Sequence, residues 1–266
     1  ERYVGHLLVK AGEPIDHAAV HGYTGERAAA RILRLCGEER LLVHIRGLDD
    51  ADGLEFTGRD GGYASTSLDV AGDVDLRVDL TPSMWITGQV THLLSKWTLE
   101  GNQRAYTLAI ISNGHLQMRV SANGVNFFSR TATEPIPASD GQRLAVRAAV
   151  ETVGSDHVTR FYTAQTIDGP WVQLGNPVTF PALTIMDSSA PLIVGGAEEG
   201  TECLLPAGSV VHAAQVRDGA ALVADVDFRR QAVGATQFID GVGRPWTVHG
   251  DARIVGVGTS MPMGPQ

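Results

Sequence analysis

The chain has 266 residues, of which 43% are hydrophobic, and its formal net charge is −9. The hydrophobic content is ordinary for a globular protein with a packed core, while the acidic balance argues against nucleic acid as a partner, because phosphate contacts need clustered Lys and Arg. No segment approaches the ~18 consecutive apolar residues of a membrane helix, so no membrane insertion is expected. The sequence begins with Glu1, which indicates a processed product or a piece of a longer polypeptide.

The first 58 residues differ in pattern from the rest and are predicted to form an N-terminal helical adaptor segment. Thr24 is a suitable N-cap for a helix over about Gly25–Cys36, whose apolar residues recur at helical spacing, and Gly37 supplies a C-terminal stop. Leu41–Ile45 is a short strand candidate. Leu48–Gly62 is rich in Asp and Gly and is predicted to be a loop or linker.

From Tyr63 onward the pattern is one strand after another. Val74–Leu80 alternates apolar residues with charged ones, which is the period of a strand with one buried face. Leu144–Glu151 and His157–Ala164 are predicted to form a hairpin. Further strands are predicted at Val90–Trp97, Ile193–Gly196, Ser209–Arg217, Leu222–Phe228 and Trp246–Val248.

Two similar turn signals, Asn113-Gly114 and Asn123-Gly124, stand ten residues apart between alternating runs. Asn-Gly tolerates the positive φ of a tight type I′ hairpin. The runs Tyr106–Ser112, His115–Ser121 and Val125–Thr131 are therefore predicted to be three consecutive antiparallel strands.

Together these signals predict a mainly β protein, a two-sheet antiparallel sandwich or jelly roll preceded by a small N-terminal segment with one helix. The sandwich is assigned to residues 59–250, and residues 251–266, rich in Gly and Pro, to a tail or linker.

Paired carboxylates would be the signature of a glycosidase on such a fold. Strand alternation places Asp73, Asp75, Arg77 and Asp79 on one face, where two acids could serve as acid and nucleophile. Arg77 lies among them as a neutralising partner, and the opposite face is apolar. The favoured interpretation is therefore a solvated face whose charges keep the sheet soluble.

Other catalytic and metal-binding patterns are missing from the sequence. It contains no Gly-x-Ser-x-Gly motif and no glycine-rich phosphate loop. The acidic residues Asp49, Asp50 and Asp52 could offer oxygens to calcium, but they lack the order of a dedicated calcium loop. We therefore expect no catalytic residues, no cofactor and no assigned metal ligand.

Aromatic side chains could bind sugar rings through their apolar faces. Each of the four tryptophans is expected first of all to anchor the core or a strand edge. The best polar and aromatic patch is Trp97 with Asn102, Arg104 and Tyr106, which flank the Glu100-Gly101 loop. These four residues are the tentative ligand-binding set.

An ordered series of blocks resembles concanavalin A-like, laminin-G-type jelly rolls, in particular those in minor tail proteins of actinobacterial phages. The series covers most of residues 59–250, and a shorter match at Tyr23–Leu35 is similar to a helical segment that precedes such jelly rolls. The matching blocks are Tyr63–Leu80, Leu94–Trp97 with Gly101–Arg104, Leu116–Gly124, Phe161–Ala164 with Asp168–Gly175, Asp187–Gly195, Val216–Gly219 and Asp225–Phe228.

The resemblance implies a non-enzymatic structural component of a virion tail, with other phage tail proteins as partners and three-fold or six-fold homo-oligomers. It leaves contact with host cell-wall glycan open. Calcium is common in laminin-G-type domains, yet calcium ligands are not assigned to particular positions of this sequence. The alternatives are a secreted carbohydrate-binding module or glycoside hydrolase of jelly-roll fold, and a purely structural interaction module.

Overall fold

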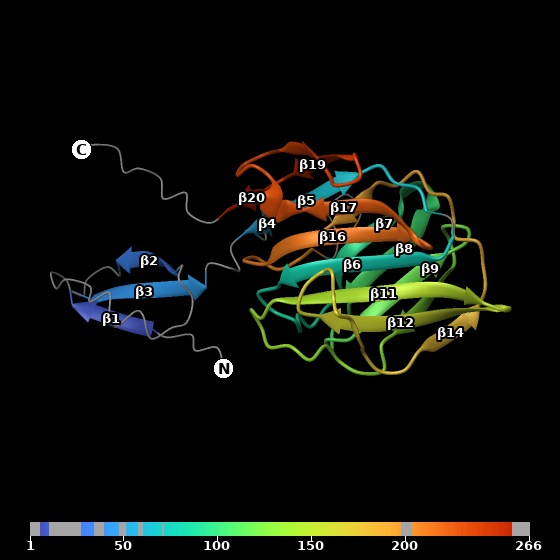
Figure 1. Cartoon of the computed structure of the whole chain (residues 1–266), viewed down its shortest axis with the longest axis horizontal. Coiled ribbons are helices and arrows are strands. Elements are labelled where there is room, and N and C mark those ends of the chain that lie inside the picture. Colours follow the sequence, from blue (N-terminus) through green and yellow to red (C-terminus); the bar gives the residue numbers. More distant parts are fainter. Residues whose placement is uncertain are drawn as a thin grey trace. The chain divides into compact units, whose positions relative to one another are not determined.

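A computed structural model describes residues 6–10, 28–34, 40–47, 52–57, 61–70, 72–197 and 204–256. The chain divides into two compact units, one made of Glu1–Asp52 with Gly256–Gln266 and the other of Gly53–Val255 (Figure 1). The second unit contains almost all of the described residues, and the candidate ligand-binding surface lies on it.

The first unit contains a three-stranded antiparallel sheet in the order β1-β3-β2, with bounds β1 His6–Lys10, β2 Ala28–Arg34 and β3 Arg40–Gly47. The strand predicted at Leu41–Ile45 is therefore confirmed. The helix predicted over Gly25–Cys36 is wrong in its described part, because Ala28–Arg34 is a strand paired along its length with β3. Pairing with a neighbouring strand overrides the weak helix preference of so short a segment. Residues 25–27, 35 and 36 lie outside the described part of the chain.

In its described residues, the second unit consists of strands and two short 3₁₀ helices. Its elements are β4 Gly53–Glu55, β5 Tyr63–Thr66, β6 Val74–Thr81, β7 Thr91–Thr98, η2 Glu100–Asn102, β8 Gln103–Ile110, β9 Leu116–Ser121, β10 Phe127–Thr131, β11 Leu144–Val153, β12 Asp156–Ala164, β13 Val172–Gln173, β14 Val178–Pro181, β15 Leu192–Val194, β16 Val210–Asp218, β17 Ala221–Asp227, η4 Phe228–Arg230, β18 Gln237–Ile239, β19 Pro245–His249 and β20 Arg253–Val255.

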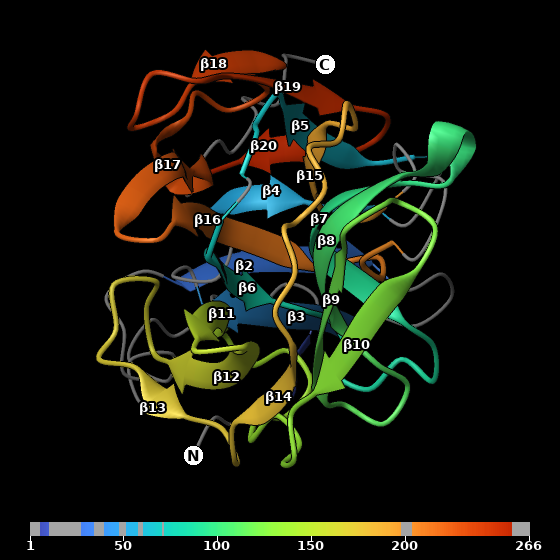
Figure 2. The same ribbon diagram turned by 90° about the vertical axis from the view of Figure 1, so that its right-hand side faces the viewer.

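These strands form two antiparallel sheets that pack face to face, the jelly-roll sandwich that the sequence predicts (Figures 1 and 2). The β8 sheet has the order β10-β9-β8-β7-β15-β5-β19-β18. The β6 sheet has the order β13-β12-β11-β6-β16-β4-β20, with β14 paired to β12 and β17 paired to β16. The chain crosses repeatedly from one sheet to the other, so strands distant in sequence become neighbours.

The core lies between the sheets and is built by alternation. Val74, Leu76, Val78 and Leu80 of β6 are fully buried and belong to it, as the period of that strand predicts. Trp246 is also buried in the core, and its indole N–H donates to Asp240 at 3.1 Å. A buried tryptophan with a satisfied N–H contributes a large apolar area at no cost in lost hydrogen bonds.

The predicted meander is confirmed, since β8, β9 and β10 are consecutive and antiparallel. The predicted turn type is wrong. Asn102 is the only residue other than glycine with positive φ in the described part of the chain, so Asn113 and Asn123 do not adopt the type I′ conformation. Only the glycines are left-handed, with φ of 82° at Gly114 and 71° at Gly124. Both hairpins therefore have loops longer than the two-residue loop of a type I′ turn.

The segment predicted as a loop at Leu48–Gly62 contains β4. Its Leu54 is fully buried and lies between Val211 of β16 and Ile254 of β20. Pairing with two strands and the burial of Leu54 hold this three-residue strand, and composition alone gives no sign of it. Because β20 pairs with β4, the sandwich includes residues on both sides of the 59–250 range.

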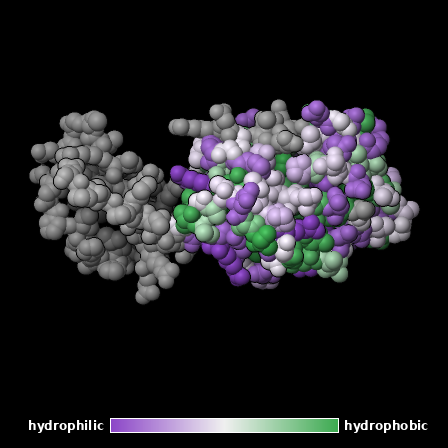
Figure 3. All heavy atoms as spheres, turned by 90° about the horizontal axis from the view of Figure 1, so that it is seen from above, coloured by the Kyte–Doolittle hydropathy of each residue, from purple (hydrophilic) through white to green (hydrophobic). Residues whose placement is uncertain are grey.

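On the outer surface of the sandwich, hydrophilic and hydrophobic residues alternate over short distances. Figure 3 shows hydrophilic and hydrophobic residues intermingled on one face of the second unit. Large apolar residues exposed elsewhere include Leu99, Val125, Phe127 and Phe128, which gather around η2 and β10. This end of the β8 sheet therefore exposes aromatic and apolar side chains close to Trp97, Asn102 and Arg104, which the sequence singled out.

Candidate ligand-binding surface

Three side chains from three strands meet on the outer face of the β8 sheet. Trp97 of β7 lies opposite Arg104 of β8, and the Arg104 guanidinium carbon is 5.8 Å from the centre of the Trp97 ring and 5.9 Å from that of Phe127. The rings of Trp97 and Phe127 meet edge to face, with centres 5.2 Å apart. Phe127 is 42% exposed, whereas Trp97 is nearly buried. The buried tryptophan thus supports an exposed phenyl ring.

Arg104 also fixes the loop between β9 and β10. Its Nε donates to the carbonyl of Gly124, and its Nη2 donates to that of Val125 at 2.9 Å. The Asn123 side-chain oxygen accepts from the backbone N–H groups of Val125, at 3.0 Å, and of Asn126, at 2.8 Å. The loop that leads into Phe127 is therefore held in one conformation by side-chain hydrogen bonds.

Asn102 lies at the rim of this surface. It is exposed at the end of η2, with a left-handed φ of 56°. A Cβ atom at Gly124 would lie 1.6 Å from the Asn102 carbonyl oxygen, so only glycine allows the two loops to approach this closely. Three of the four predicted residues, Trp97, Asn102 and Arg104, are thereby brought to one end of the sheet.

Tyr106, the fourth predicted residue, lies on the opposite side of the sheet in the core and is fully buried. Strand alternation would put Arg104 and Tyr106 on one face. However, the register shifts here, so that Trp97 pairs with Arg104 while Lys96 pairs with Tyr106. The unpaired residue, Ala105, is a β-bulge, and the bulge turns the two side chains to opposite faces. Burial raises the pKa of the Tyr106 hydroxyl. Tyr106 is therefore not part of the surface.

One further residue completes the surface. Arg119 of β9 has its guanidinium carbon 5.7 Å from the centre of the Phe127 ring, and its Nε donates to Gln117 at 2.7 Å. We call Trp97, Arg104, Arg119 and Phe127 the arginine–aromatic face. The sequence analysis missed Arg119 and Phe127. The signal that could have found them is charge, because residues 101–133 contain three arginines and no Asp or Glu in a chain of net charge −9.

The third arginine of that segment, Arg130, lies at the edge of the sandwich. Its guanidinium carbon is 5.5 Å from the ring centre of Phe128 and 5.1 Å from that of Phe180, and these two rings stack with centres 5.2 Å apart. Its Nε donates to the carbonyl of Thr179 at 2.7 Å. Figure 2 shows β10 and β14, which carry these residues, side by side. Phe127 and Phe128 therefore point to opposite sides of β10.

His92 lies beneath the arginine–aromatic face and stays neutral. It is buried, and its Nδ1 is 2.9 Å from the Thr107 hydroxyl. Burial, with a smaller contribution from the positive charge of Arg119, lowers the pKa of His92 to about 4. The imidazole therefore adds no charge to the surface at neutral pH.

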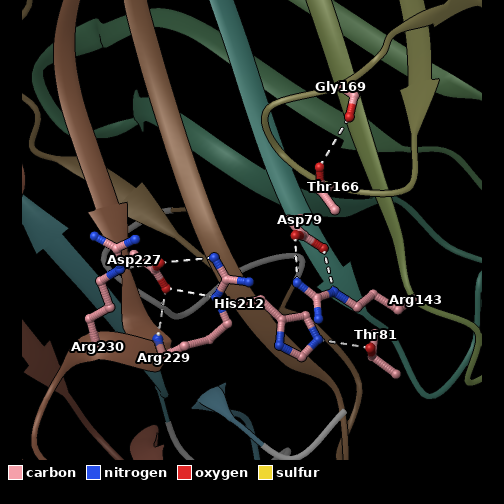
Figure 4. A network of polar contacts seen from close by, with 9 residues as sticks. All are labelled: Asp79, Thr81, Arg143, Thr166, Gly169, His212, Asp227, Arg229 and Arg230. Atoms are coloured by element: carbon pink, nitrogen blue, oxygen red, sulfur yellow. Dashed lines mark hydrogen bonds and ion pairs between the residues drawn. The ribbon is translucent and has the colours of Figure 1, made fainter. Parts of the chain in front are cut away.

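The outer face of the β6 sheet carries the acids considered as a catalytic pair. Asp79 is fully buried and accepts two hydrogen bonds from Arg143, at 2.9 and 2.8 Å (Figure 4). Asp75 is 7% exposed and accepts from Arg77 at 2.7 Å and from Arg147 at 2.9 Å. The predicted solvated face is therefore wrong for these two acids. Arginines from the same and neighbouring segments cover them and neutralise them.

This arrangement gives Asp75 and Asp79 separate partners. Residues four apart on a strand are about 13 Å apart, well beyond the separation of a glycosidase acid pair. Asp73 is also engaged, since it accepts from the Thr152 hydroxyl at 2.7 Å. The three acids named in the sequence thus stabilise the sheet, and nothing in their geometry brings two of them together over a substrate.

The described part of the chain contains no group of three or more His, Cys, Asp or Glu residues that could hold a metal ion. Asp49 and Asp50, two of the acids considered for calcium, lie outside it. None of its helices is long and apolar enough to cross a membrane.

No family description matches the sequence, and no curated protein matches it. Among solved structures, the chain is similar to a putative carbohydrate binding protein from Bacteroides ovatus, with 12% identity, 83% of this chain and 66% of that chain covered, and a TM-score of 0.49. It is similar to domains LG4-5 of the mouse laminin alpha1 chain, with 17% identity, coverage of 73% and 49%, and a TM-score of 0.44.

A third similar structure is the CBM40 domain of the Ruminococcus gnavus IT-sialidase bound to alpha2,3 sialyllactose, with 13% identity, coverage of 60% and 88%, and a TM-score of 0.43. The fold assignment rests on the strand order and sheet packing. The fold and the surface together define a jelly-roll domain with an arginine–aromatic face at one end of the β8 sheet.

Proposed function

We propose that this chain is a carbohydrate-binding module that takes a glycan on the arginine–aromatic face. The observation that carries the proposal is the exposed Phe127 ring, held edge-on by Trp97 beside the Arg104 guanidinium. A sugar ring has an apolar C–H face and a rim of hydroxyl groups. It is recognised by an aromatic ring next to planar hydrogen-bond donors, a combination present here.

The surface is prepared for binding because the parts that would contact a sugar are already fixed. Arg104 is anchored at both Gly124 and Val125, and Trp97 is nearly buried against the sheet. A ligand would therefore order few side chains on binding, which lowers the entropic cost of association. The Asn102 side chain at the rim is exposed and offers an amide that can both donate and accept.

The proposal is one of binding without catalysis and without a cofactor. It is supported by the pairing of Asp75 and Asp79 with separate arginines on the other sheet. Binding is expected to be the same in the presence of calcium and of a chelator. Incubation with a bound glycan is expected to release no new reducing ends.

The test uses two neighbouring phenylalanines of similar exposure. Phe127 is 42% and Phe128 38% exposed, but Phe128 stacks on Phe180 at the edge of the sandwich. On a glycan array that includes bacterial cell-wall polysaccharides, the wild type is expected to bind. F127A is expected to weaken binding by about tenfold, the worth of one aromatic contact, while F128A leaves it unchanged. The proposal fails if no glycan binds, or if F128A loses as much as F127A.

A finer role, that of a minor component of a phage tail, is supported by the ordered blocks between Tyr63 and Phe228 that resemble phage jelly rolls. In that role the partners are other tail proteins, the location is the virion tail, and the chain assembles in threes or sixes. Gold-labelled antibodies against the chain should then mark tails in electron micrographs, and mass photometry should give three or six copies. Labelling of other particles, or a monomer, would contradict it.

A further inference from the structure

The arginines of this domain fall into two groups that differ in their partners. On the outer face of the β6 sheet, Arg77 and Arg147 pair with Asp75, and Arg143 pairs with Asp79. At the end of the β8 sheet, Arg104 and Arg130 donate only to neutral backbone carbonyls. Among the described residues, no carboxylate forms an ion pair with either of them.

This difference leaves a local positive charge on an acidic chain. Residues 101–133 contain Arg104, Arg119 and Arg130 and no Asp or Glu; with the flanking Glu100 and Glu134, three arginines and two glutamates leave a net charge of +1 with histidine neutral, whereas the whole chain has −9. His92 beneath the face is neutral at pH 7, because its pKa is about 4. This segment is therefore positive on an acidic chain, and its charge favours an anion there over other parts of the surface.

The unused donors are suited to a carboxylate. A guanidinium has five N–H donors in a planar fork. Arg104 uses two of them, toward the carbonyls of Gly124 and Val125, and its remaining donors have no partner in the described part of the chain. A fork with donors remaining binds a carboxylate through short, charge-assisted hydrogen bonds. The Phe127 ring beside it offers an apolar surface to the sugar that carries this carboxylate.

Resting on the proposed function, we infer that the glycan bound by the arginine–aromatic face carries a carboxylate, as a uronic or sialic acid does. Arg104 and Arg119 contact the acid group, and Phe127 contacts the ring. A neutral sugar would leave the charge of Arg104, which donates only to backbone carbonyls, without a counter-charge and would gain nothing from the arginines in this segment.

The test pairs each acidic probe with a neutral counterpart. Binding of the full chain is measured by calorimetry to oligogalacturonate and its methyl ester, and to sialyllactose and lactose. We expect the acidic member of at least one pair to bind about tenfold or more tightly than its counterpart, and this advantage to shrink as NaCl rises from about 50 to 500 mM. The two pairs distinguish a uronic acid from a sialic acid.

Charge-matched variants locate the effect. R119Q is expected to reduce the preference for the acidic probe at least about fivefold, whereas R253Q, which removes one charge from an exposed arginine paired with Glu55, is expected to leave it unchanged. Near-ultraviolet circular dichroism verifies the fold of each variant. Equal binding of acidic and neutral probes would overturn the inference and leave the proposed function standing. An equal loss in R253Q would also overturn it, and binding of no glycan would overturn both.

Discussion

At the scale of single residues, the Tyr106 hydroxyl is a buried polar group without a partner. Tyr106 is fully enclosed in the core, and its hydroxyl makes no hydrogen bond within the described part of the chain. A buried donor that has lost water without gaining a partner costs about 1–3 kcal/mol. The ring itself packs between the sheets, so the side chain stabilises the core through its carbon atoms and weakens it through its oxygen.

Tyr106→Phe is therefore expected to raise the free energy of unfolding by about 1 kcal/mol, because it removes the unsatisfied hydroxyl and keeps the ring. Urea denaturation of wild type and variant measures the change. Glycan binding should be the same in both, since the ring lies on the core side of the β8 sheet. A loss of stability would show that the hydroxyl has a partner, and a loss of binding would return Tyr106 to the ligand-binding set.

At the scale of elements, the β8–β9–β10 meander positions the arginine–aromatic face through its loops. The loop between β9 and β10 approaches η2 so closely that Gly124 lies against the Asn102 carbonyl. Arg104 then ties the same loop to β8. The rim of the face thus depends on a close approach of two backbones as well as on side-chain chemistry.

Substitutions at two glycines with the same φ distinguish the cost of a left-handed backbone from the cost of the close approach to Asn102. Gly124 and Gly141 both have φ of 71°, but a Cβ at Gly141 would meet nothing within 4 Å. Gly141→Ala should cost about 1 kcal/mol of unfolding free energy, from the left-handed conformation alone. Gly124→Ala adds a clash with the Asn102 carbonyl and should cost about 1–3 kcal/mol more.

Gly124→Ala should also weaken glycan binding, because the loop must move away from Asn102, whereas Gly141→Ala should leave binding unchanged. Thermal unfolding and the glycan array provide the two measurements. Equal destabilisation by the two substitutions would show that the loop gives way without cost. Unchanged binding in Gly124→Ala would show that the rim takes no part in it.

The meander also shows what the sequence could predict and what it could not. Alternation and the Asn-Gly signals predicted the three strands, because a period of two residues is a local property. The pairing of Trp97 with Arg104 joins β7 to β8 and lies outside the three predicted strands. The bulge at Ala105 has no local signature, so Tyr106 was assigned to the wrong face. Likewise, Ala28–Arg34 fits a helix by local spacing, and only its pairing with β3 makes it a strand.

At the scale of the whole molecule, the charge distribution separates the two sheets. The β6 sheet carries acids and arginines in mutual pairs, while the end of the β8 sheet carries arginines that pair with backbone carbonyls. Arginines paired with acids leave little net charge on a face. Arginines that pair only with backbone carbonyls leave a positive charge that attracts anions. The inferred preference for an acidic glycan rests on this contrast between the arginine–aromatic face and a chain of net charge −9.

The same charge distribution makes stability depend on pH through His92. Burial and the charge of Arg119 lower the pKa of His92 from 6.5 to about 4. Between these two values the unfolded chain binds a proton that the folded chain excludes. The free energy of unfolding therefore falls as the pH falls from about 6.5 to about 4, by up to about 3 kcal/mol from this group.

His92→Gln removes the titrating group and keeps a side chain that can hydrogen-bond to Thr107. The difference in unfolding free energy between wild type and variant should therefore favour the wild type most above about pH 6.5 and shrink steadily toward about pH 4. Urea denaturation at a series of pH values gives this difference directly, because the other titrating groups are common to both proteins. A difference that is constant across the range would show that His92 is protonated in the folded chain as readily as in the unfolded one, and that neither burial nor Arg119 disfavours its charge.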